Sequence, residues 1–536
     1  MKIVFRQQAE LTEREIMHLV QLFFEDVELK LERMADGPVS TATDAVEKVN
    51  DGTEKHREEG QESFDQEAPV VHILAVVEET GDNVVARVQL SIGEEEPAAS
   101  YTYQKELAQS ISAREKRRLR KQSVAHALVK VLERWTGLSQ PWGILTGVRP
   151  TKLMHRFRRE GRTERELREH FEEHLLVKPE KRLLLEEIVK KQLEVVPDFD
   201  QIDQEVSIYI GIPFCPTKCA YCTFPAYAIN RKGSQVDQFL RVLEEEMKEI
   251  GDWLARNQLK ITSIYFGGGT PTSIEAEELD RLFQVMQDHF HSFNGVRELT
   301  VEAGRPDTIT REKLEVLRKW QVDRISINPQ SFTQKTLEAI GRHHTVEEVL
   351  EKYALARKHG LNNINMDLII GLPGEGVKEL EHSLSEIEKL RPESLTIHTL
   401  SFKRASTLTK NKEKYQVAER KEIQEMMDLA TRWTKERGYH PYYLYRQKNI
   451  LGNLENVGYA LTGYESIYNI IIMEEAQTII GLGCGAVSKI LSPHTKQLTR
   501  WPNPKDPYTY VSNYGSMIKA KLEALDQLYG NALIPK

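Results

Sequence analysis

Cysteine, long apolar runs and an excess of basic charge are all missing from this sequence of 536 residues. Only four residues are cysteine, which excludes a small scaffold held together by disulfides. No uncharged apolar run reaches the roughly 18 residues that a membrane-spanning helix needs. The N-terminal MKIVFRQQAELTEREI reaches charged residues almost at once. We therefore expect neither a membrane span nor a secretory signal.

The overall charge is slightly acidic. Lys and Arg number 73 and Asp and Glu number 81, so the formal net charge is −8, which argues against a dedicated nucleic-acid-binding protein. The basic run REKRRLRK at 114–121 is more typical of a solvated helix face with counter-charges nearby. With 40% hydrophobic and 29% charged residues, the composition is that of an ordinary globular protein. We expect a cytoplasmic monomer in a reducing compartment.

The hydrophobic pattern divides the chain into three parts. Residues 1–200 form an α+β N-terminal region, 201–405 an α/β barrel region, and 406–536 a mostly helical C-terminal region. The first part contains a strand (KIVF), an amphipathic helix over 11–34 and a β-hairpin that turns at 81–83. An acidic insertion at 35–68 is poor in apolar residues, and we expect it to be disordered.

Short β-branched runs alternate with charged helical patterns in the second part. Such alternation predicts parallel βα units, which close into an open barrel or a wound sheet. In both architectures, functional side chains gather at the carboxyl ends of the strands. The six expected strands are 206–212, 261–266, 298–303, 324–327, 363–370 and 394–400.

Three of the four cysteines lie within eight residues, directly after the first of these strands. Cys215, Cys219 and Cys222 fit around one metal centre. Structural zinc usually takes four ligands in two separated pairs. Iron–sulfur clusters are held by thiolates, and three ligands leave one iron open. We therefore favour an iron–sulfur cluster over zinc, and we interpret Cys484 as a small buried residue.

This spacing after a first strand resembles the radical S-adenosylmethionine (SAM) superfamily. The resemblance implies a partial (β/α)6 barrel, a [4Fe-4S] cluster ligated by Cys215, Cys219 and Cys222, and SAM bound to the open iron. In that superfamily the reduced cluster cleaves SAM into methionine and a 5′-deoxyadenosyl radical. The glycine run 267–269, which permits close backbone approach, lies along the SAM in that superfamily.

Longer segments resemble the oxygen-independent coproporphyrinogen III oxidases, and among them the HemZ-type branch. These segments are IYIGIPFCPTKCAYCTFPAYAI, VEAGRPDTIT, NMDLIIGLPGEG and HTLSFKRAS, with WGILTGVRPTKL ahead of the barrel. The resemblance implies decarboxylation of the tetrapyrrole coproporphyrinogen III to protoporphyrinogen IX in haem biosynthesis, with an external electron donor. Positions that match contacts to the SAM on the cluster are Tyr209, Gly268, Glu302, Ser401 and Val487, with Tyr209 and Glu302 as the catalytic group. Positions that match contacts to a second SAM are Tyr221, Gly269, Thr270, Gln330, Arg342 and Asp367.

The sequence departs from that family at two places. The oxidases carry a fourth cysteine two residues after the third, where this chain has Phe224, as do paralogues that include a haem-chaperone branch. That branch carries a His-Asn-x-x-Tyr-Trp element, whereas the segment 453–459 here contains neither His nor Trp. Two alternatives therefore stay open: a haem-binding or haem-transfer paralogue without decarboxylase activity, and a radical SAM enzyme that acts on another substrate.

A substrate with four propionates needs cations, preferably arginine, which pairs with a carboxylate through two hydrogen bonds. We interpret His343 and His344 as part of a solvated loop. The candidate cations at predicted loop ends are Arg342, Lys403, Arg404, Arg446 and Lys448.

Overall fold

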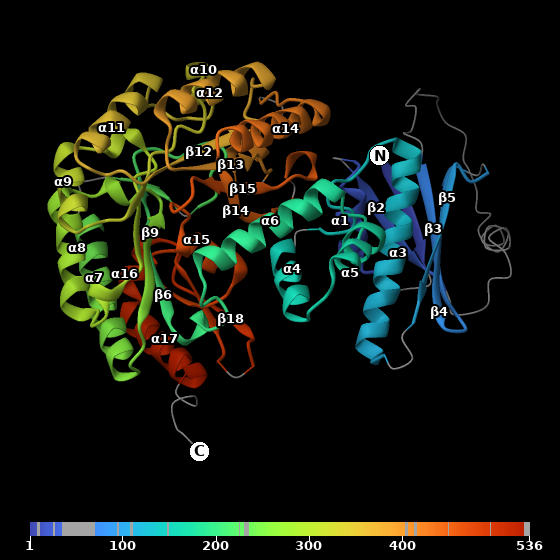
Figure 1. Ribbon diagram of the computed structural model, residues 1–536, viewed down its shortest axis with the longest axis horizontal. Helices are drawn as coiled ribbons and strands as arrows, with labels where there is room; N and C mark the ends of the chain where they lie inside the picture. The colour runs from blue at the N-terminus through green and yellow to red at the C-terminus, as the bar shows by residue number, and fades with distance from the viewer. Residues whose placement is uncertain are drawn as a thin grey trace, which may run out of the picture. The chain divides into compact units, whose positions relative to one another are not determined.

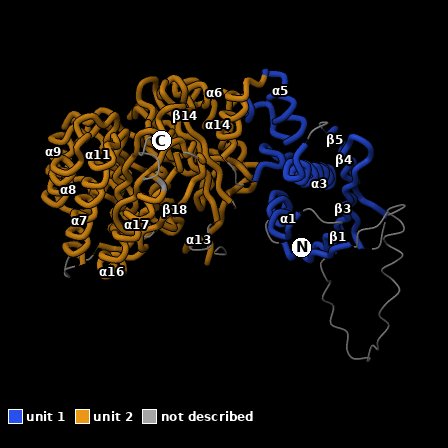
Figure 2. Tube along the Cα trace, turned by 90° about the horizontal axis from the view of Figure 1, so that it is seen from below, with its two compact units in different colours: residues 1–146, 163–182 blue, residues 147–162, 183–536 orange. Residues whose placement is uncertain are grey.

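The computed structural model divides the chain into two compact units (Figure 2). Unit 1 is Met1–Thr146 with Thr163–Arg182, and unit 2 is Gly147–Arg162 with Leu183–Lys536. The acidic insertion expected at 35–68 lies outside the described residues, and the three-part division of the chain stays a prediction. The described residues are 1–7, 11–24, 27–34, 70–93, 96–107, 111–146, 149–224, 226–229, 235–402, 406–411, 415–448, 450–493 and 495–529.

Unit 1 is a five-stranded sheet in the order β2-β1-β3-β4-β5. β1 is parallel to β2 and β3, whereas β3, β4 and β5 pair in antiparallel fashion. The hairpin turn expected at 81–83 is confirmed, since Thr80 pairs with Asn83. The strands are β1 Lys2–Gln7, β2 Glu28–Arg33, β3 Val70–Thr80, β4 Asn83–Ile92 and β5 Ala99–Glu106.

Two capped helices of unit 1 share a hydrophobic core with the sheet. In α1 Glu13–Val20, the Thr12 side chain accepts from the Glu15 N–H, and Glu15 accepts in return from Thr12. The single helix expected over 11–34 is wrong beyond α1, because the alternating ELKLER segment forms β2 beside β1. The other helices of unit 1 are α3 Ala113–Thr136, α5 Glu164–Arg168 and the π-helical turn Glu169–His174.

The basic run 114–121 lies at the start of α3 and is paired with acids, as expected. Lys116 and Arg120 both contact Glu79, at 2.6 and 3.2 Å, and Lys121 contacts Glu15 at 2.9 Å. Part of this charge is therefore neutralised within unit 1.

No helix among the described residues is long and apolar enough to cross a membrane.

Unit 2 contains a sheet of eleven strands in the order β14-β15-β13-β12-β11-β10-β9-β6-β16-β17-β18. The six strands expected from the sequence are all present and pair in parallel, from β13 through β12, β11, β10 and β9 to β6. Their apolar runs are buried on both faces, as is usual for parallel strands covered by helices. They are β6 Val206–Ile212, β9 Ile261–Gly268, β10 Glu298–Glu302, β11 Arg324–Ser326, β12 Ile364–Ile370 and β13 Ser394–Thr399.

Helices connect each parallel strand to the next and lie along the outer side of the barrel (Figure 1). This arrangement confirms the partial (β/α)6 barrel. The connecting helices are α7 Gln235–Arg256, α8 Ala276–His289, α9 Arg311–Lys319, α10 Gln334–Ala339, α11 Val346–Lys358 and α12 Val377–Leu390. α4 Pro150–Arg159 also belongs to unit 2, and α6 Pro179–Val195 crosses the boundary in sequence.

The C-terminal region adds helices and also extends the sheet at both edges. β15 and β14 continue it beyond β13, and β16 pairs in parallel with β6, followed by β17 and β18. The strands are β14 His440–Tyr445, β15 Asn456–Ala460, β16 Thr478–Gly483, β17 Val487–Leu491 and β18 Leu498–Pro502. The helices are α13 Thr407–Lys410, α14 Arg420–Glu436, α15 Ile467–Glu474, α16 Pro507–Ser512 and α17 Tyr514–Tyr529.

Candidate functional site

The cysteine loop follows β6 at the carboxyl end of the barrel strands. Its first cysteine ends the short strand β7 Phe214–Cys215, which pairs with β8 Tyr227–Ala228. Cys215 Sγ lies 3.4 Å from the Thr270 hydroxyl, which follows the glycine run after β9. Cys219 is buried, and Cys222 is half-buried. Two segments predicted from separate motifs therefore meet at this loop.

Arg305 organises the same loop. Its Nη1 donates to the Thr217 hydroxyl at 3.0 Å and lies 3.8 Å from Cys219 Sγ. Its other nitrogens form a double hydrogen bond with Asp307, at 2.8 and 3.0 Å. Arg305 was not predicted from the sequence, although it lies three residues after Glu302. Its buried guanidinium offers a hydrogen-bond donor to the Cys219 sulfur.

The donor set of the loop suits an iron–sulfur cluster. All three cysteines are free, and the other two thiols lie close enough to influence the titration of Cys215. Burial, above all, raises the pKa of Cys215 to about 11. Metal binding displaces such protons. Among the described residues, no three His, Cys, Asp or Glu side chains already stand in metal-coordinating geometry. The loop thus supplies the donors without a preformed arrangement of them.

The glycine run is dictated by close packing against β6 and β7. A Cβ atom on Gly269 would lie 2.5 Å from the Phe214 carbonyl oxygen, and one on Gly267 would lie 3.0–3.2 Å from two tyrosine rings. The N–H groups of Gly269 and Thr270 donate to Ile212 and Phe214 at 2.7 Å. Gly268 has a φ of +106°, which few other residues adopt. These glycines place the Thr270 hydroxyl beside Cys215.

Five of the six barrel strands are buried except for one partly exposed residue each, and this residue is never the first of its strand. These residues are Tyr209 in β6, Gly268 in β9, Glu302 in β10, Asp367 in β12 and His398 in β13. Four of the five are predicted site residues. The strands belong to one sheet, in which β11 separates β10 from β12, and Asp367 and His398 lie close enough to influence the titration of Glu302. We call this set of partly exposed positions the lumen.

Glu302 is the most perturbed carboxyl of the lumen. Its pKa is raised to about 7, chiefly because burial disfavours the charged form, with a smaller contribution from the charge of Asp367. The Tyr265 hydroxyl donates to Glu302 and opposes this shift. The rings of Tyr209 and Tyr265 stack with centroids 6.2 Å apart, and Tyr468 stacks on Tyr265 at 4.4 Å. Tyr265, which lies two residues before the glycine run, was not predicted from the sequence as a site residue.

The pKa of Asp367 is shifted in the opposite direction to that of Glu302. Burial raises its pKa, but His398 and Asn365 outweigh burial and the net shift is downward. His398 Nε2 lies 3.3 Å from one carboxylate oxygen, and Asn365 Nδ2 donates to the other at 2.8 Å. The Asp367 carbonyl accepts from the Gln330 N–H at 2.9 Å. Gln330 has a φ of +68°, a strained conformation that often marks functional positions.

Tyr221 lies within the cysteine loop, and Arg342 lies beside it. Arg342 is buried and donates to the carbonyls of Asn328 and Gly304, the latter at 3.2 Å. Burial lowers the pKa of Arg342, but the nearby Tyr221 hydroxyl and Cys219 thiol outweigh burial, so the net shift is upward. Burial likewise raises the pKa of the Tyr221 hydroxyl.

The remaining predicted residues have other surroundings than the cysteine loop and the lumen. The Ser401 hydroxyl donates to the Lys448 carbonyl at 2.8 Å, and Val487 begins β17 with a partly exposed side chain. Arg446 is buried and donates to the carbonyls of Asn453 and Leu454. Lys403 and Arg404 lie outside the described residues. Cys484 is buried, as expected.

The interpretation of His344 as a solvated residue is wrong. Its side chain is fully buried, and neither ring nitrogen has a hydrogen-bond partner among the described residues. Burial, reinforced by Arg342 and Arg305, lowers the pKa of His344 to about 3. The segment packs inward because the Ile340 carbonyl accepts from the Ala220 N–H of the cysteine loop.

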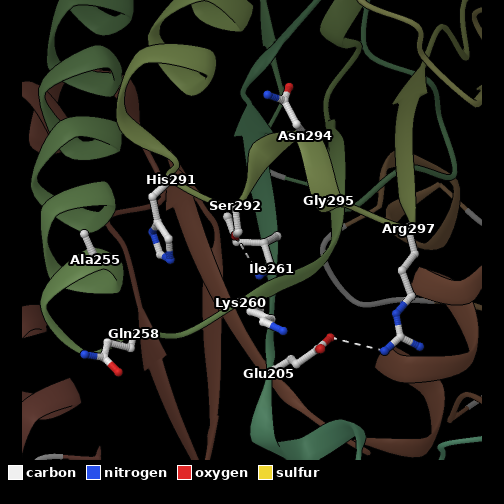
Figure 3. Close-up of a pocket in the computed structure, with 10 residues that line it drawn as sticks. All are labelled: Glu205, Ala255, Gln258, Lys260, Ile261, His291, Ser292, Asn294, Gly295 and Arg297. Carbon is white, nitrogen blue, oxygen red and sulfur yellow. Dashed lines mark hydrogen bonds and ion pairs between the residues drawn. The ribbon is translucent and has the colours of Figure 1, made fainter.

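A surface hollow lies at the opposite, amino end of the parallel strands (Figure 3). It is lined by residues that precede β6, β9 and β10, including Glu205, Lys260 and Arg297. Arg297 is paired with Asp198 at 2.6 Å and with Glu205 at 3.4 Å. The charge of Arg297 is therefore matched by carboxylates. None of the predicted site residues lines the hollow.

The chain is similar to known proteins in sequence and in fold. The family model described as the radical SAM superfamily matches residues 209–387. The oxygen-independent coproporphyrinogen-III oxidase-like protein HemZ of Bacillus subtilis is 59% identical over 409 residues, which cover 76% of this chain and 82% of the relative. The heme chaperone HemW of the same organism is 32% identical over 52% of this chain and 70% of the relative. The structure of coproporphyrinogen III oxidase (HemN) from Escherichia coli is 20% identical, with a TM-score of 0.48 over 61% of this chain and 72% of that one.

Proposed function

Since the chain belongs to the radical SAM superfamily, and within it to the oxygen-independent coproporphyrinogen-III oxidase-like family, we propose that it oxidatively decarboxylates the propionates of coproporphyrinogen III. Membership of the superfamily brings a [4Fe-4S] cluster and SAM to this chain. The substrate is inferred from the similarity to the coproporphyrinogen-III oxidase-like protein HemZ, which is 59% identical.

The observation that carries the proposal is the meeting of the cysteine loop with the carboxyl end of the barrel. Cys215 contacts Thr270 after β9, and Arg305 after β10 reaches Cys219. Glu302 and Asp367 occupy partly exposed positions of β10 and β12, which lie on either side of β11. A cluster on the loop would therefore stand beside a polar lumen, where a reacting group can be held away from bulk water.

Cys215, Cys219 and Cys222 would hold the cluster in this proposal. When bound, the reduced cluster and SAM supply a 5′-deoxyadenosyl radical and release methionine. The protein contributes the surroundings. Arg305 offers an N–H to the Cys219 sulfur, and such outer contacts tune iron–sulfur centres.

The two lumen carboxyls would bind the polar groups of SAM in different ways. Asp367, which is ionised and held by His398 and Asn365, accepts hydrogen bonds from ribose hydroxyls. Glu302, with a pKa of about 7, accepts from the ammonium group in its ionised form. The stacked rings of Tyr209, Tyr265 and Tyr468 would supply apolar surface beside Glu302.

The proposed reaction removes one hydrogen atom, CO2 and one electron from each propionate. The hydrogen atom passes from the β-carbon to the 5′-deoxyadenosyl radical and leaves as part of 5′-deoxyadenosine. The bond to the carboxylate carbon then breaks, CO2 departs, and one electron passes to an external acceptor, so that a vinyl group forms. Repetition at a second propionate converts coproporphyrinogen III to protoporphyrinogen IX. Arg342 and Arg446 donate to backbone carbonyls, so the substrate carboxylates would be held by other cations.

The test is anaerobic incubation of the cluster-reconstituted protein with dithionite, SAM and coproporphyrinogen III. Chromatography then quantifies 5′-deoxyadenosine and the vinyl product together. The proposal expects both to appear, and formation of 5′-deoxyadenosine without any vinyl product would overturn the substrate assignment. Absence of 5′-deoxyadenosine with an intact cluster would overturn the proposed radical chemistry as well.

A second candidate function is haem handling. Phe224 stands where the oxidases carry a fourth cysteine, and the residue is 57% exposed, so the loop presents an apolar surface there in place of a thiol. The heme chaperone HemW is among the relatives. This candidate expects stoichiometric haem binding, seen as a shift of the Soret band, that weakens in Phe224→Ser. Unchanged haem affinity in that variant would count against it.

A further inference from the structure

Four cations converge on one carboxylate at the other end of unit 2. Glu475, which follows α15, lies 2.6 Å from Arg149 Nη1, 2.7 Å from Lys152 Nζ and 3.0 Å from Arg500 Nη2. Lys489 lies near the same group and donates to the Ile472 carbonyl at 3.2 Å. We call Arg149, Lys152, Lys489 and Arg500 the basic cluster.

The positive charge of this cluster exceeds the negative charge available to it. Among the described residues, Glu475 is the one carboxylate within ion-pair distance of these cations. Lys489 and Arg500 are direct cross-strand neighbours in β17 and β18, an arrangement that is unfavourable for like charges. A polyvalent anion placed among them would relieve this repulsion.

The orientation of Arg149 also leaves hydrogen-bonding capacity unused. The Nη1 atom of Arg149 is buried and lies within ion-pair distance of Glu475. The N–H groups on this one nitrogen nevertheless form no hydrogen bond with an acceptor among the described residues. Arg149 precedes α4, whose first turn receives no side-chain cap. The first N–H groups of a helix favour anions. Guanidinium groups and helix N–H groups together suit the oxygens of a phosphate group.

The cluster is separate from the candidate site. Thr478, three residues after Glu475, pairs with Val206, the first residue of β6, whereas the cysteine loop follows the last residue of β6. The cluster therefore lies toward the amino end of the barrel strands. Arg149 and Lys152 come from the WGILTGVRPTKL segment, to which the proposed function assigns no role.

We propose that the basic cluster is a binding site for a phosphate-type oxyanion, either inorganic phosphate or the phosphate group of a small phosphomonoester. The anion sits among Arg149, Arg500 and Lys489 and competes with Glu475 for them. This inference is independent of the reaction at the cysteine loop.

Protonation of Lys489 is coupled to this binding. Its pKa is lowered to about 7, first by burial and then by Arg149, Arg500 and Lys152, with Glu475 acting in the opposite sense. A bound anion favours the charged ammonium. Binding of phosphate above pH 7 is therefore expected to take up a proton, which calorimetry in buffers of different ionisation enthalpy measures.

The first test titrates the full-length protein with inorganic phosphate at low ionic strength by calorimetry, and then with glucose 6-phosphate. We expect saturable binding that weakens at least tenfold in Arg149→Gln/Arg500→Gln. Tighter binding of the ester identifies a phosphomonoester as the ligand, and equal or weaker binding identifies free phosphate. The matched control is Arg311→Gln, which removes an exposed ion pair of α9 and should leave affinity unchanged. No saturable binding, or equal binding by the double variant, would overturn the proposal.

A second variant separates ligand binding from a structural role. Glu475→Gln removes the competing carboxylate, so we expect severalfold tighter phosphate binding. Phosphate should also raise the melting temperature of this variant more than that of the unchanged protein. If the five side chains serve only as an ion-paired link between α4 and β18, Glu475→Gln destabilises the protein and phosphate does not restore it. That outcome would contradict an anion site even where the arginine variant fails to fold.

Discussion

At the scale of single residues, two carboxyls of one lumen titrate in opposite directions. Burial and the neighbouring charge of Asp367 raise the pKa of Glu302, whereas His398 and Asn365 keep Asp367 ionised. Such a division between two acids is typical of sites that bind and move charge. The pH dependence of cofactor binding should therefore report on Glu302.

Glu302 gives the first prediction. If its ionised form accepts the SAM ammonium, SAM affinity should rise with pH through about 7 and level off above it. Glu302→Gln should weaken SAM binding about tenfold and abolish the pH dependence. Tyr265→Phe removes a donor that lowers the pKa of Glu302, so the midpoint should move to higher pH. Equilibrium dialysis at pH 6, 7 and 8 measures this, and a flat profile in the unchanged protein contradicts it.

The cysteines give the second prediction, with a control inside the chain. Cys219→Ser should abolish the brown cluster while leaving the far-ultraviolet circular dichroism unchanged, because a loop ligand is lost but no strand is altered. Cys484→Ala removes a buried cysteine outside the loop and should retain full iron content. Iron and sulfide analysis after reconstitution distinguishes the two, and equal iron in both variants would refute the ligand assignment.

At the scale of elements, the cysteine loop depends on how closely β9 approaches β6 and β7. Gly269→Ala would place a methyl group 2.5 Å from the Phe214 carbonyl oxygen, one residue before Cys215. We expect a loss of about 1–3 kcal/mol in the free energy of unfolding, together with poorer cluster incorporation. Gly295→Ala, where no atom lies within 4 Å, should be neutral in both measurements. Urea unfolding with iron analysis tests this, and a neutral Gly269→Ala would contradict it.

The C-terminal helix α17 is tied to α7 and β16 by a buried charge pair. Lys521 Nζ lies 2.8 Å from Glu246, which also accepts from the Gly483 N–H at 2.7 Å and from the Tyr510 hydroxyl at 2.6 Å. Lys521→Met should lower the free energy of unfolding by about 3–5 kcal/mol, because it leaves the buried Glu246 carboxylate without a countercharge. The double variant Glu246→Gln/Lys521→Met should cost less than Lys521→Met alone. A double-mutant cycle in urea measures the difference, and additive losses would contradict a coupled pair.

At the scale of the whole molecule, buried titratable groups make stability depend on pH. Burial lowers the pKa of His126 in unit 1 to about 4 and that of His344 in unit 2 to about 3. Burial also raises the pKa of Glu375 to about 7. The two histidines stay neutral in the folded protein at pH values where they bind protons in the unfolded chain. Glu375 keeps its proton in the folded protein at pH values where it has lost it in the unfolded chain.

The direction of each pKa shift sets how the free energy of unfolding changes with pH. Below pH 6.5 both histidines bind protons in the unfolded chain before they do so in the folded protein. Each histidine therefore lowers the free energy of unfolding by up to about 1.4 kcal/mol per pH unit as the pH falls toward 4. The contribution of Glu375 is present at low pH and is lost as the pH rises from 4.5 to 7. We expect Glu375→Gln to steepen the loss of stability on acidification and His126→Gln to flatten it. Urea unfolding of the cluster-free protein at pH 5, 6 and 7 tests this, and identical slopes would contradict it.

Local patterns in the chain determine the order of the elements and the ligand loop. Each of the six barrel strands lies within a residue or two of its predicted range, because a buried parallel strand needs a continuous apolar run that few helices share. The three cysteines are equally evident, since their spacing depends on neighbouring residues alone. The segment 28–33 was misassigned as helix because its role as β2 depends on pairing with a distant β1.

Long-range packing decided the rest. Arg305 reaches Cys219 from 86 residues away, and Tyr265 meets Glu302 across 37 residues. His344 is buried only because its segment packs against the cysteine loop. Arg149, which precedes α4, and Lys152 of α4 meet Arg500 of β18 at Glu475, across more than 300 residues of sequence. Local patterns carry no such information, because the pKa of a side chain and the partner of a charge are set by whichever segments the fold brings beside it.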